Sequence, residues 1–577
     1  CALIDSLFKK LRRFVRRHTT TLRWMFIALF LMILSALSFS RYQRNQTIQQ
    51  FLDLADQIGS KIEADKEKIE SEIEANKEKE PPEEQLYSQK SVFHRKKLTD
   101  LYTKVTDAYR KVLDIDKNHE VAKKGFAHNY FELWEIGLIE NNENLMRVSK
   151  QIIQQCLGKD YPSSEEAQEI AGLQNITLKS DPPGAEIYLF RFEEAENSCL
   201  LPIPYCSPPN SKSRGEIKEQ WLEAHNKDKE GIPPCPPFND SVYSLPLEAK
   251  NCWGKTNLQL SQVAFGRYLV VLKLDGYLPL RVSLNILHPW FTKNIKPSPP
   301  PLEFSFKLIP NVQKVQGFTY IPPTAFLYGE EKENSKTAEG FWIQTHEATL
   351  GEYTTYLESL CQTKAGKNKA ESLLPRTFGQ AGKSLNLLDI QPIEGDSQKR
   401  YSILPNKNLE QILADPKNWR ESPVCGVSYT DAKEYLKWRS EQDHRLYRLP
   451  TEKEWELAAR GADGRKYSWG NDFVLGLAKL TQGYGGFSTQ KIREPQPSVK
   501  FKDESVFGVV DMGGSLAEWV EGFFDPEVKE DAPGVLRVIR GNAWGLTPMG
   551  IECAFRTSGL ADYFHATIGF RYCFTAP

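Results

Sequence analysis

Four cysteines lie close together in the middle of the chain, and their spacing limits the chemistry they can do. They are Cys199, Cys206, Cys235 and Cys252. In an oxidising compartment these thiols would pair as disulfides, and three pairings would satisfy all four. A zinc site normally shows tight Cys-x-x-Cys pairs, whereas the closest two cysteines here are separated by six residues. The spacing favours disulfides over zinc and leaves free thiols as the alternative.

Other catalytic constellations are missing from the sequence. His346 and His444 each stand alone, and an isolated histidine is usually a surface or core residue. There is no Gly-x-Ser-x-Gly, no Cys-x-x-Cys, no phosphate-binding loop, and no His-Arg-Asp or Asp-Phe-Gly kinase motif. The residues of this chain therefore give no support to hydrolase or kinase chemistry.

The stretch 423–461 is expected to organise the C-terminal half of the chain. Its first part has apolar residues at helical spacing after Thr430-Asp431, a pair that can cap a helix. In its second part Thr451 and Glu454 form a capping box, and Gly461 ends the apolar pattern. The stretch thus predicts two helices joined by a short loop.

Several motifs over residues 315–574 follow the order found in the formylglycine-generating enzymes, also called sulfatase-modifying factors. The chain resembles that family most specifically at Arg448-Leu-Pro-Thr-Glu452 with Glu454-Trp-Glu456. The further motifs are Gly340–Leu357, Tyr467–Gly470, Gly508–Met512, Ala517–Trp519, Val538–Gly541 and Ile568–Arg571. The resemblance implies a C-type-lectin-like α+β fold for residues 311–577.

The family's activity, the conversion of a sulfatase cysteine into formylglycine with dioxygen, uses copper(I) held by two cysteines. Copper(I) is a soft ion, and thiolate is the ligand that suits it. The resemblance places both cysteines within residues 541–552, which contain none. Cys553 falls where some members carry a structural disulfide, and Met549 is only a weak ligand. We therefore expect neither copper nor catalytic residues in this chain.

The resemblance also implies calcium binding and a ligand-binding surface. The family's Gly-Asn-x-x-Glu-Trp loop is residues 514–519 here, with Ser515 in place of Asn. One calcium ion would be left with oxygen atoms of Gly513, Gly514, Leu516 and Glu518. A second calcium is not expected, because Lys479 stands at its position. A ligand is expected near the Trp-rich loops, at Trp519, Trp544, Arg540 and Arg556.

The N-terminal part carries a membrane-insertion pattern. A basic segment, 1–23, precedes an uncharged apolar run, 24–40. About 17 residues at 1.5 Å each give roughly 25 Å, the short end of a membrane span. The positive-inside rule then places 1–23 in the cytoplasm and the bulk of the chain in the periplasm, as a single-pass inner-membrane protein. A cleaved signal peptide is the weaker alternative. Because the chain starts at Cys1, we expect a fragment or a processed product.

Two helical regions are expected next. In 41–80, apolar residues recur in steps of four and three, which indicates either a coiled-coil stalk that dimerises or a single charged helix. The seam consists of Ile48, Leu52, Ala55, Gly59, Ile62, Lys66, Ile69 and Ile73, with breaks at Gly59 and Lys66. Residues 81–172 resemble one tetratricopeptide-repeat boundary and predict a small helical hairpin domain.

A change to alternating apolar and polar residues marks the next region, 173–310. It resembles a PEGA domain, which is a small β-sandwich, around the turn at Pro183-Gly184. Residues 193–253 interrupt it as a Cys- and Pro-rich insertion, and Pro297–Pro301 link it to the last domain.

The whole chain is too long for one core, so several domains are expected. Its 74 basic and 75 acidic side chains nearly cancel and give no reason to expect nucleic-acid binding. The layout resembles the part after the kinase domain of a chlamydia-type transmembrane Ser/Thr kinase. We predict the external, non-catalytic sensor or ligand-binding region of a single-span bacterial signalling protein, with an unknown ligand or protein partner. The alternatives are an active formylglycine-generating or related metal-dependent oxidase, and a structural envelope protein.

Overall fold

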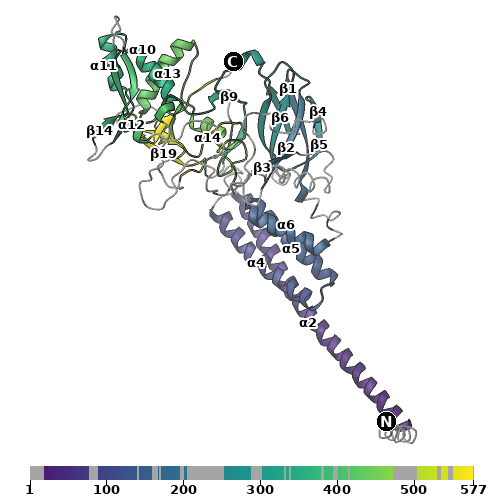
Figure 1. Ribbon diagram of the computed structural model, residues 1–577. Coiled ribbons are helices and arrows are strands. Elements are labelled where there is room, and N and C mark those ends of the chain that lie inside the picture. The colour runs from purple at the N-terminus through teal and green to yellow at the C-terminus, as the bar shows by residue number, and fades with distance from the viewer. Residues whose placement is uncertain are drawn as a thin grey trace, which may run out of the picture. The chain divides into compact units, whose positions relative to one another are not determined.

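The computed structural model divides the chain into two compact units, Cys1–Ala171 and Gly172–Pro577, here called the helical unit and the C-terminal unit (Figure 1). It describes residues 19–575 except 77–88, 140–141, 159–160, 162–166, 168–169, 195–199, 205–251, 287–301, 331–332, 337–338, 379–382, 394–400, 413–415, 472, 474–502, 529–533 and 544–549.

In the described part of the helical unit, four helices pack together through two apolar clusters. The helices are α2 (Thr19–Asn76), α4 (Gln89–Ile115), α5 (Glu120–Ile139) and α6 (Glu143–Leu157). Ile48, Ala55 and Ile62 of α2 are buried against α4 and α5. The predicted seam is therefore covered by helices of the same chain over this stretch, and dimerisation through the stalk stays a prediction.

The predicted membrane span, 24–40, falls within α2. Among the residues that the structure describes, no helix meets the length and apolarity of a membrane-crossing segment. The span and the topology that depends on it stay predictions.

Two β-sheets open the C-terminal unit. The first sheet has the order β5-β1-β8, and the second has the order β3-β2-β6-β7 with β4 also paired to β2. Their strands are β1 (Leu173–Asp181), β2 (Glu186–Glu194), β3 (Leu200–Pro204), β4 (Cys252–Lys255), β5 (Leu258–Ala264), β6 (Gly266–Lys273), β7 (Leu280–Ile286) and β8 (Leu302–Lys307). Apolar side chains of both sheets, among them Ile176, Leu178, Ile187 and Val270, share one core. The kinship of this sandwich with PEGA domains stays a prediction.

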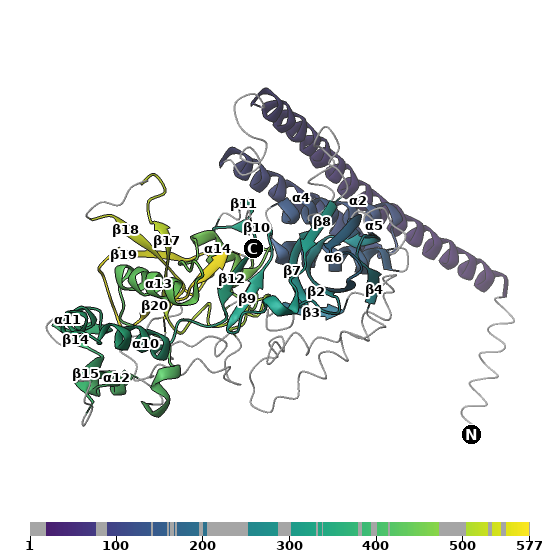
Figure 2. The ribbon, with the colours of Figure 1, turned by 90° about the horizontal axis from the view of Figure 1, so that it is seen from above.

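The other face of the second sheet is buried too. Phe190, Leu269 and Val271 belong to the same apolar cluster as Trp455 and Leu457. These two residues lie in the part of the C-terminal unit predicted as the last domain, 311–577, here called the C-terminal domain. Alternate residues of one strand thus enter two cores, which is why β6 reads as an uninterrupted apolar run. Figure 2 shows α14 and β9 lying between α13 and the sandwich strands. The sandwich and the C-terminal domain therefore form one packed body.

The C-terminal domain mixes short strands with helices. Two of its sheets have the orders β21-β12-β9 and β19-β18-β17-β20. Its elements are β9 (Phe318–Ile321), β10 (Ala325–Tyr328), β11 (Glu333–Lys336), β12 (Phe341–Gln344), α10 (Leu350–Leu360), α11 (Lys364–Ser372), β13 (Arg376–Phe378), β14 (Ser384–Asn386), β15 (Leu388–Pro392), β16 (Tyr401–Pro405), α12 (Lys407–Ile412), α13 (Tyr429–Asp443), α14 (Glu452–Arg460), β17 (Ala517–Phe523), β18 (Leu536–Arg540), β19 (Arg556–Leu560), β20 (Ile568–Phe570) and β21 (Cys573–Thr575). The predicted α+β character is confirmed.

The two helices predicted from 423–461 are both present. The capping box of α14 is confirmed, because Thr451 accepts from the Glu454 backbone N–H and Glu454 accepts from that of Thr451. The expected cap of α13 at Thr430-Asp431 is wrong. Ser428 is the N-cap, and Asp431 is its partner at the third helical position. The first two helical residues are therefore Tyr429 and Thr430.

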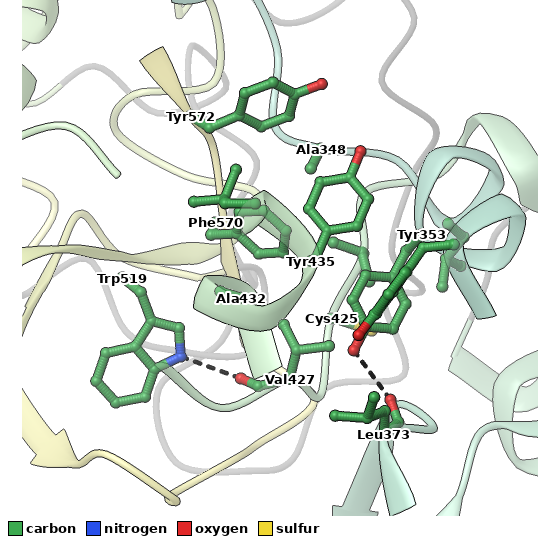
Figure 3. Close-up of a cluster of buried hydrophobic side chains, with 14 of the residues drawn as sticks. Ala348, Tyr353, Leu373, Cys425, Val427, Ala432, Tyr435, Trp519, Phe570 and Tyr572 are labelled. Carbon is green, nitrogen blue, oxygen red and sulfur yellow. Dashed lines mark hydrogen bonds between the residues drawn. The ribbon is translucent and has the colours of Figure 1, made fainter. Parts of the chain in front are cut away.

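An aromatic core joins α10, α13 and the last strands (Figure 3). Tyr353 of α10 donates to the Leu373 carbonyl at 3.0 Å, which satisfies its buried hydroxyl. Tyr435 of α13 packs against Phe570 and Tyr572 at centroid distances of 5.6 and 6.0 Å. This core fixes α13 against β20 and the residues that follow it, where the Ile568–Arg571 motif lies.

Candidate functional site

The carboxylates of α14 hold a buried ion-pair network. Arg540, predicted to bind a ligand, is 1% exposed and donates to Glu452 at 3.0 Å and to the Cys553 carbonyl at 2.7 Å. Its second carboxylate partner is Glu456, which also pairs with Arg460. Paired guanidinium groups of this kind hold elements together. Arg540 has no donor surface facing solvent in this arrangement.

Arg556 lies at the outer edge of the same network. It donates to Glu452 at 3.0 Å and to the Phe524 carbonyl at 3.0 Å. Its side chain is 36% exposed, unlike that of Arg540. Of the two arginines predicted to bind a ligand, the structure leaves only Arg556 partly open to solvent.

Glu518, the one side chain expected to ligate calcium, is fully committed to another partner. Arg571 donates to both of its carboxylate oxygens at 2.7 Å, and Trp455 Nε1 donates at 3.0 Å. Calcium needs several free oxygen ligands, and an adjacent guanidinium repels a cation. Without Glu518, only the backbone oxygens of the expected set, those of Gly513, Gly514 and Leu516, would be left. These residues do not fit a calcium ion, and calcium binding stays an untested prediction.

The tryptophans expected at the ligand surface divide in two. Trp519 is fully buried and donates from Nε1 to the Val427 carbonyl at 3.0 Å, as Figure 3 shows. It therefore supports the core and offers no face to a ligand. Trp544 lies outside the described residues, so its expected role stays a prediction.

The thiols nearest the expected copper position are buried. Burial raises the pKa of Cys553 to about 12, and it also raises the pKa of Cys573 although Arg448 donates to that sulfur at 3.0 Å. Without a metal both groups are therefore thiols at neutral pH. The expected copper(I) site needs a pair of cysteines, and residues 541–552 contain none. The residues present therefore do not fit that site.

The four cysteines of the insertion are only partly described. Cys199, Cys206 and Cys235 lie outside the described residues. Cys252 is half-buried in β4, and its thiol lies 3.4 Å from the Gly254 carbonyl oxygen. The predicted disulfides therefore stay a prediction.

An exposed apolar surface that sequence reasoning missed lies beside α13. Leu560 is the last residue of β19, Tyr563 follows three residues later and donates its backbone N–H to the Leu560 carbonyl, and Phe564 stacks on Phe378 at 4.8 Å between ring centroids. Leu560, Tyr563 and Phe378 are 44%, 40% and 43% exposed. We call these four residues the β19 patch. Exposed apolar groups that lie near one another often mark a binding surface.

Arg376 packs against one ring of the patch, that of Phe564. Arg376 places its guanidinium carbon 4.3 Å from the centre of the Phe564 ring and donates to Asp431 at 2.8 Å. One face of Phe564 is thus covered by Arg376 and the other by Phe378. No sequence pattern joins Phe378 to Phe564, since 185 residues separate them, and this explains why the patch was missed.

The sequence of the C-terminal region matches a known domain family. Residues 305–576 match the sulfatase-modifying factor enzyme 1-like domain, and the C-terminal region of the chain is a domain of that family. The resemblance inferred from the sequence motifs is thereby confirmed for this region.

Curated relatives include both inactive and active members. The inactive C-alpha-formylglycine-generating enzyme 2 of Mus musculus is 35% identical over 160 residues, which are 26% of this chain and 48% of that protein. The formylglycine-generating enzyme of Streptomyces coelicolor is 29% identical over 174 residues, 26% of this chain and 51% of that protein. The chain thus spans about half the length of these relatives.

A third relative has a different overall description. The serine/threonine-protein kinase Pkn1 of Chlamydia trachomatis is 29% identical over 173 residues, which are 28% of this chain and 25% of that protein. The likeness therefore concerns a quarter of that kinase. This likeness agrees with the resemblance, inferred from the sequence, to the layout of a chlamydia-type transmembrane Ser/Thr kinase.

Proposed function

We propose that the C-terminal domain is a non-catalytic binding domain within the external region of a bacterial membrane signalling protein. The observation that carries the first half of this proposal is the absence of the cysteine pair. Residues 541–552 supply no cysteine, and the next thiol along the chain, that of Cys553, is buried. The name of the murine relative describes an inactive member of the family, which supports the same conclusion.

The β19 patch is the surface proposed for ligand contact. The Phe564 ring of this patch is contacted by Arg376, which pairs with Asp431, so this ring is in place before any ligand arrives. Arg556, which is also partly exposed, adds a positive charge elsewhere on the domain surface. The ligand class stays open, because neither the patch nor Arg556 carries a geometry that selects one.

The membrane and kinase context rests on the N-terminal half of α2 and on the likeness to Pkn1. Apolar side chains of α2 from Leu29 to Phe39 are between 42% and 63% exposed. A lipid environment would cover such a surface at no cost to the fold. The basic residues before it support a cytoplasmic N-terminus and a periplasmic C-terminal unit.

An active formylglycine-generating or other metal-dependent oxidase is the second candidate. The relative from Streptomyces coelicolor favours it by name. It would require thiolates at positions where this chain has none. A purely structural envelope role is the third candidate, and no particular contact supports it.

Reading the coding sequence upstream of the Cys1 codon tests the kinase context directly. We expect an open frame that encodes a glycine-rich loop, His-Arg-Asp and Asp-Phe-Gly. A start codon close upstream of Cys1, with none of these motifs, would remove the kinase from the proposal. The binding role of the domain would then need another signalling partner.

A further inference from the structure

We propose that a polar cluster formed by Lys66, Tyr102 and Glu132 sets the register of helix α2 within the helical unit. Helix α2 is continuous from Thr19 to Asn76, so its position along α4 and α5 also fixes the position of its apolar N-terminal half. The cluster would hold α2 at one position along α4 and α5. This inference concerns the helical unit and does not depend on the function proposed for the C-terminal domain.

The apolar contacts of α2 repeat along the helix. Ile48, Ala55 and Ile62 are spaced seven residues apart, and all three are buried. Ile48 packs with Val112 of α4, whereas Ala55 and Ile62 pack in a second cluster further along. The α4 and α5 side chains buried in that second cluster are Leu101, Tyr102, Val105, Ala108, Leu133 and Ile136. Contacts that repeat at this spacing resemble the seam of a coiled coil.

The fully buried contacts of this seam tolerate a shift by seven residues in one direction, although Asp65 would then replace the partly buried Ile58. If each position of α2 were taken by the residue seven places later, Ala55 would face Val112, and Ile62 and Ile69 would follow as the next two contacts. All three contacts would stay apolar, although their side-chain sizes would change. In the opposite direction Arg41 would take the place of Ile48, and a charged residue would enter the core. Only the first shift is therefore open.

The polar cluster has no equivalent after that shift. Lys66 Nζ donates to Glu132 Oε2 at 2.8 Å, and the Tyr102 hydroxyl donates to the same oxygen at 2.6 Å. The three residues come from α2, α4 and α5, so the cluster joins all three helices. The Glu132 side chain is only 15% exposed. A seven-residue shift would put Ile73 in the place of Lys66. The Glu132 carboxylate would keep the Tyr102 hydroxyl and the exposed His128, 3.7 Å from Oε1, but would lose its lysine.

The remaining polar contacts of α2 discriminate less. Lys97 of α4 donates to Asp65 at 2.9 Å, and Glu72 stands seven residues after Asp65, so another carboxylate would replace it. Arg44 donates to the Ile115 carbonyl at 2.7 Å, but its side chain is 50% exposed. Exposed pairs contribute little because water competes for them. Among these polar contacts, the Lys66 cluster is therefore the one that separates the two registers most strongly.

Cysteine cross-linking in the full chain tests this inference. One variant carries Ile48→Cys with Val112→Cys, and a second carries Ala55→Cys with Val112→Cys. The first pair reports the register of the structure, and the second reports the shifted one. Each pair is made in the otherwise natural chain and in a background with Lys66→Met, Tyr102→Phe and Glu132→Met, which replaces the cluster by apolar groups of similar size. Cross-linked peptides are identified by mass spectrometry.

We expect the natural background to give the 48–112 product and almost no 55–112 product. In the triple background the share of the 55–112 product should rise by at least about tenfold. Circular dichroism of the same samples checks that helix content is kept, so that a shift is distinguished from unfolding. Lys97→Met, which removes the exposed pair with Asp65, is the matched control and should leave the ratio unchanged.

One result would overturn the inference. If the triple variant keeps its helix content and still yields only the 48–112 product, the fit of Ala55 and its apolar neighbours sets the register and the polar cluster does not. If the triple variant loses helix content, the single variant Lys66→Gln is used in its place. A 55–112 share that stays at the natural level in that folded variant would overturn the inference equally.

Discussion

At the scale of single residues, the charged side chains buried in the C-terminal domain hold its elements together. Arg571 of the last motif reaches Glu518 of β17 with two hydrogen bonds of 2.7 Å, and neither side chain is exposed to solvent. Further contacts from Arg571 run to the Thr345 and Val510 carbonyls. One arginine thus joins three segments that are far apart in the sequence.

Removing this arginine should destabilise the domain strongly. In Arg571→Met the Glu518 carboxylate would stay buried without its cation, and such a loss typically costs about 3–5 kcal/mol. Urea unfolding of the full chain, followed by tryptophan fluorescence, would measure the change in the free energy of unfolding. Lys433→Met is the matched control, because it breaks the more exposed pair with Glu521 and should cost less than about 1 kcal/mol. Equal losses in the two variants would contradict the role given to Arg571.

The sequence motifs identified these residues but not their environments. The Ala-Glu-Trp motif was taken to supply a calcium ligand and a ligand-facing tryptophan, and both side chains are buried in hydrogen-bonded positions. Alternation along a strand shows which residues share a face. It does not show that both faces of β17 are covered, because the covering segments come from elsewhere in the chain.

At the scale of elements, local signals predicted both ends of α14 correctly but misplaced the cap of α13. The start and end of α14 followed from Thr451, Glu454 and Gly461, whose roles depend on neighbours within a few residues. Gly461 has a φ of +72°, and a side chain there would meet Ser283 of the sandwich. The same glycine therefore ends the helix and admits the neighbouring strand, and only the first of these roles could be read from the sequence.

Glu454 should make the stability of α14 sensitive to acid. Burial raises the pKa of this carboxyl, but the hydrogen bonds and charge of Arg448 and the hydrogen bonds from Thr451 together outweigh burial and leave the pKa below its ordinary value. A carboxyl whose pKa is lowered on folding stabilises the folded state above its unfolded pKa, and the contribution is lost as the pH falls through the folded pKa. We expect Glu454→Gln to cost about 2 kcal/mol near neutral pH and progressively less in acid.

Chemical denaturation at a series of pH values would measure this difference. Glutamine keeps the size of the side chain and can still accept the Thr451 backbone N–H, so the substitution removes the charge and one of the two acceptors of Arg448. Glu358→Gln, which affects a more exposed pair with Arg420, serves as the control. A difference between Glu454→Gln and the natural chain that stays constant down to the acid range would contradict the account.

For α2, the periodicity of apolar residues predicted which face of the helix is buried but not which elements cover it. The pattern located the buried face of the helix, since Ile48, Ala55 and Ile62 are all buried. It could not identify what covers that face, because a second copy of the chain and its own α4 and α5 would produce the same spacing. The interruption at Lys66 was likewise visible, but its partner Glu132 was not.

At the scale of the whole molecule, the sandwich and the C-terminal domain belong to one unit. They were predicted as separate domains joined near residue 310, yet Leu269 and Val271 of β6 share a cluster with Trp455 of α14. Polar contacts cross the same boundary. The Ala462 backbone N–H donates to Ser283 at 3.0 Å, and the Leu200 backbone N–H donates to the Trp469 carbonyl at 2.8 Å. The apolar run of β6 contained this information, because a strand covered on one face only would alternate.

A shared core predicts shared unfolding. Native-state hydrogen exchange of the full chain at increasing denaturant should show amides of β6 and α14 converging on the same opening free energy. Amides of β15 and β16, which form a separate two-stranded sheet, provide a comparison inside the same molecule. If β6 opens at a clearly lower free energy than α14 at every denaturant concentration, the two regions are independent domains in contact.

We propose that this sulfatase-modifying factor domain binds a ligand and does not catalyse the formation of formylglycine. The most direct measurement incubates the full chain with copper(I), dioxygen and a sulfatase-derived cysteine peptide, and then quantifies formylglycine in that peptide by mass spectrometry. An active formylglycine-generating enzyme run in parallel shows that the assay works. The account predicts no formylglycine above the level of a sample without the chain, because Cys553 and Cys573 are buried thiols and residues 541–552 hold no cysteine. Formation of formylglycine over repeated turnovers would contradict it and make this domain an oxidase.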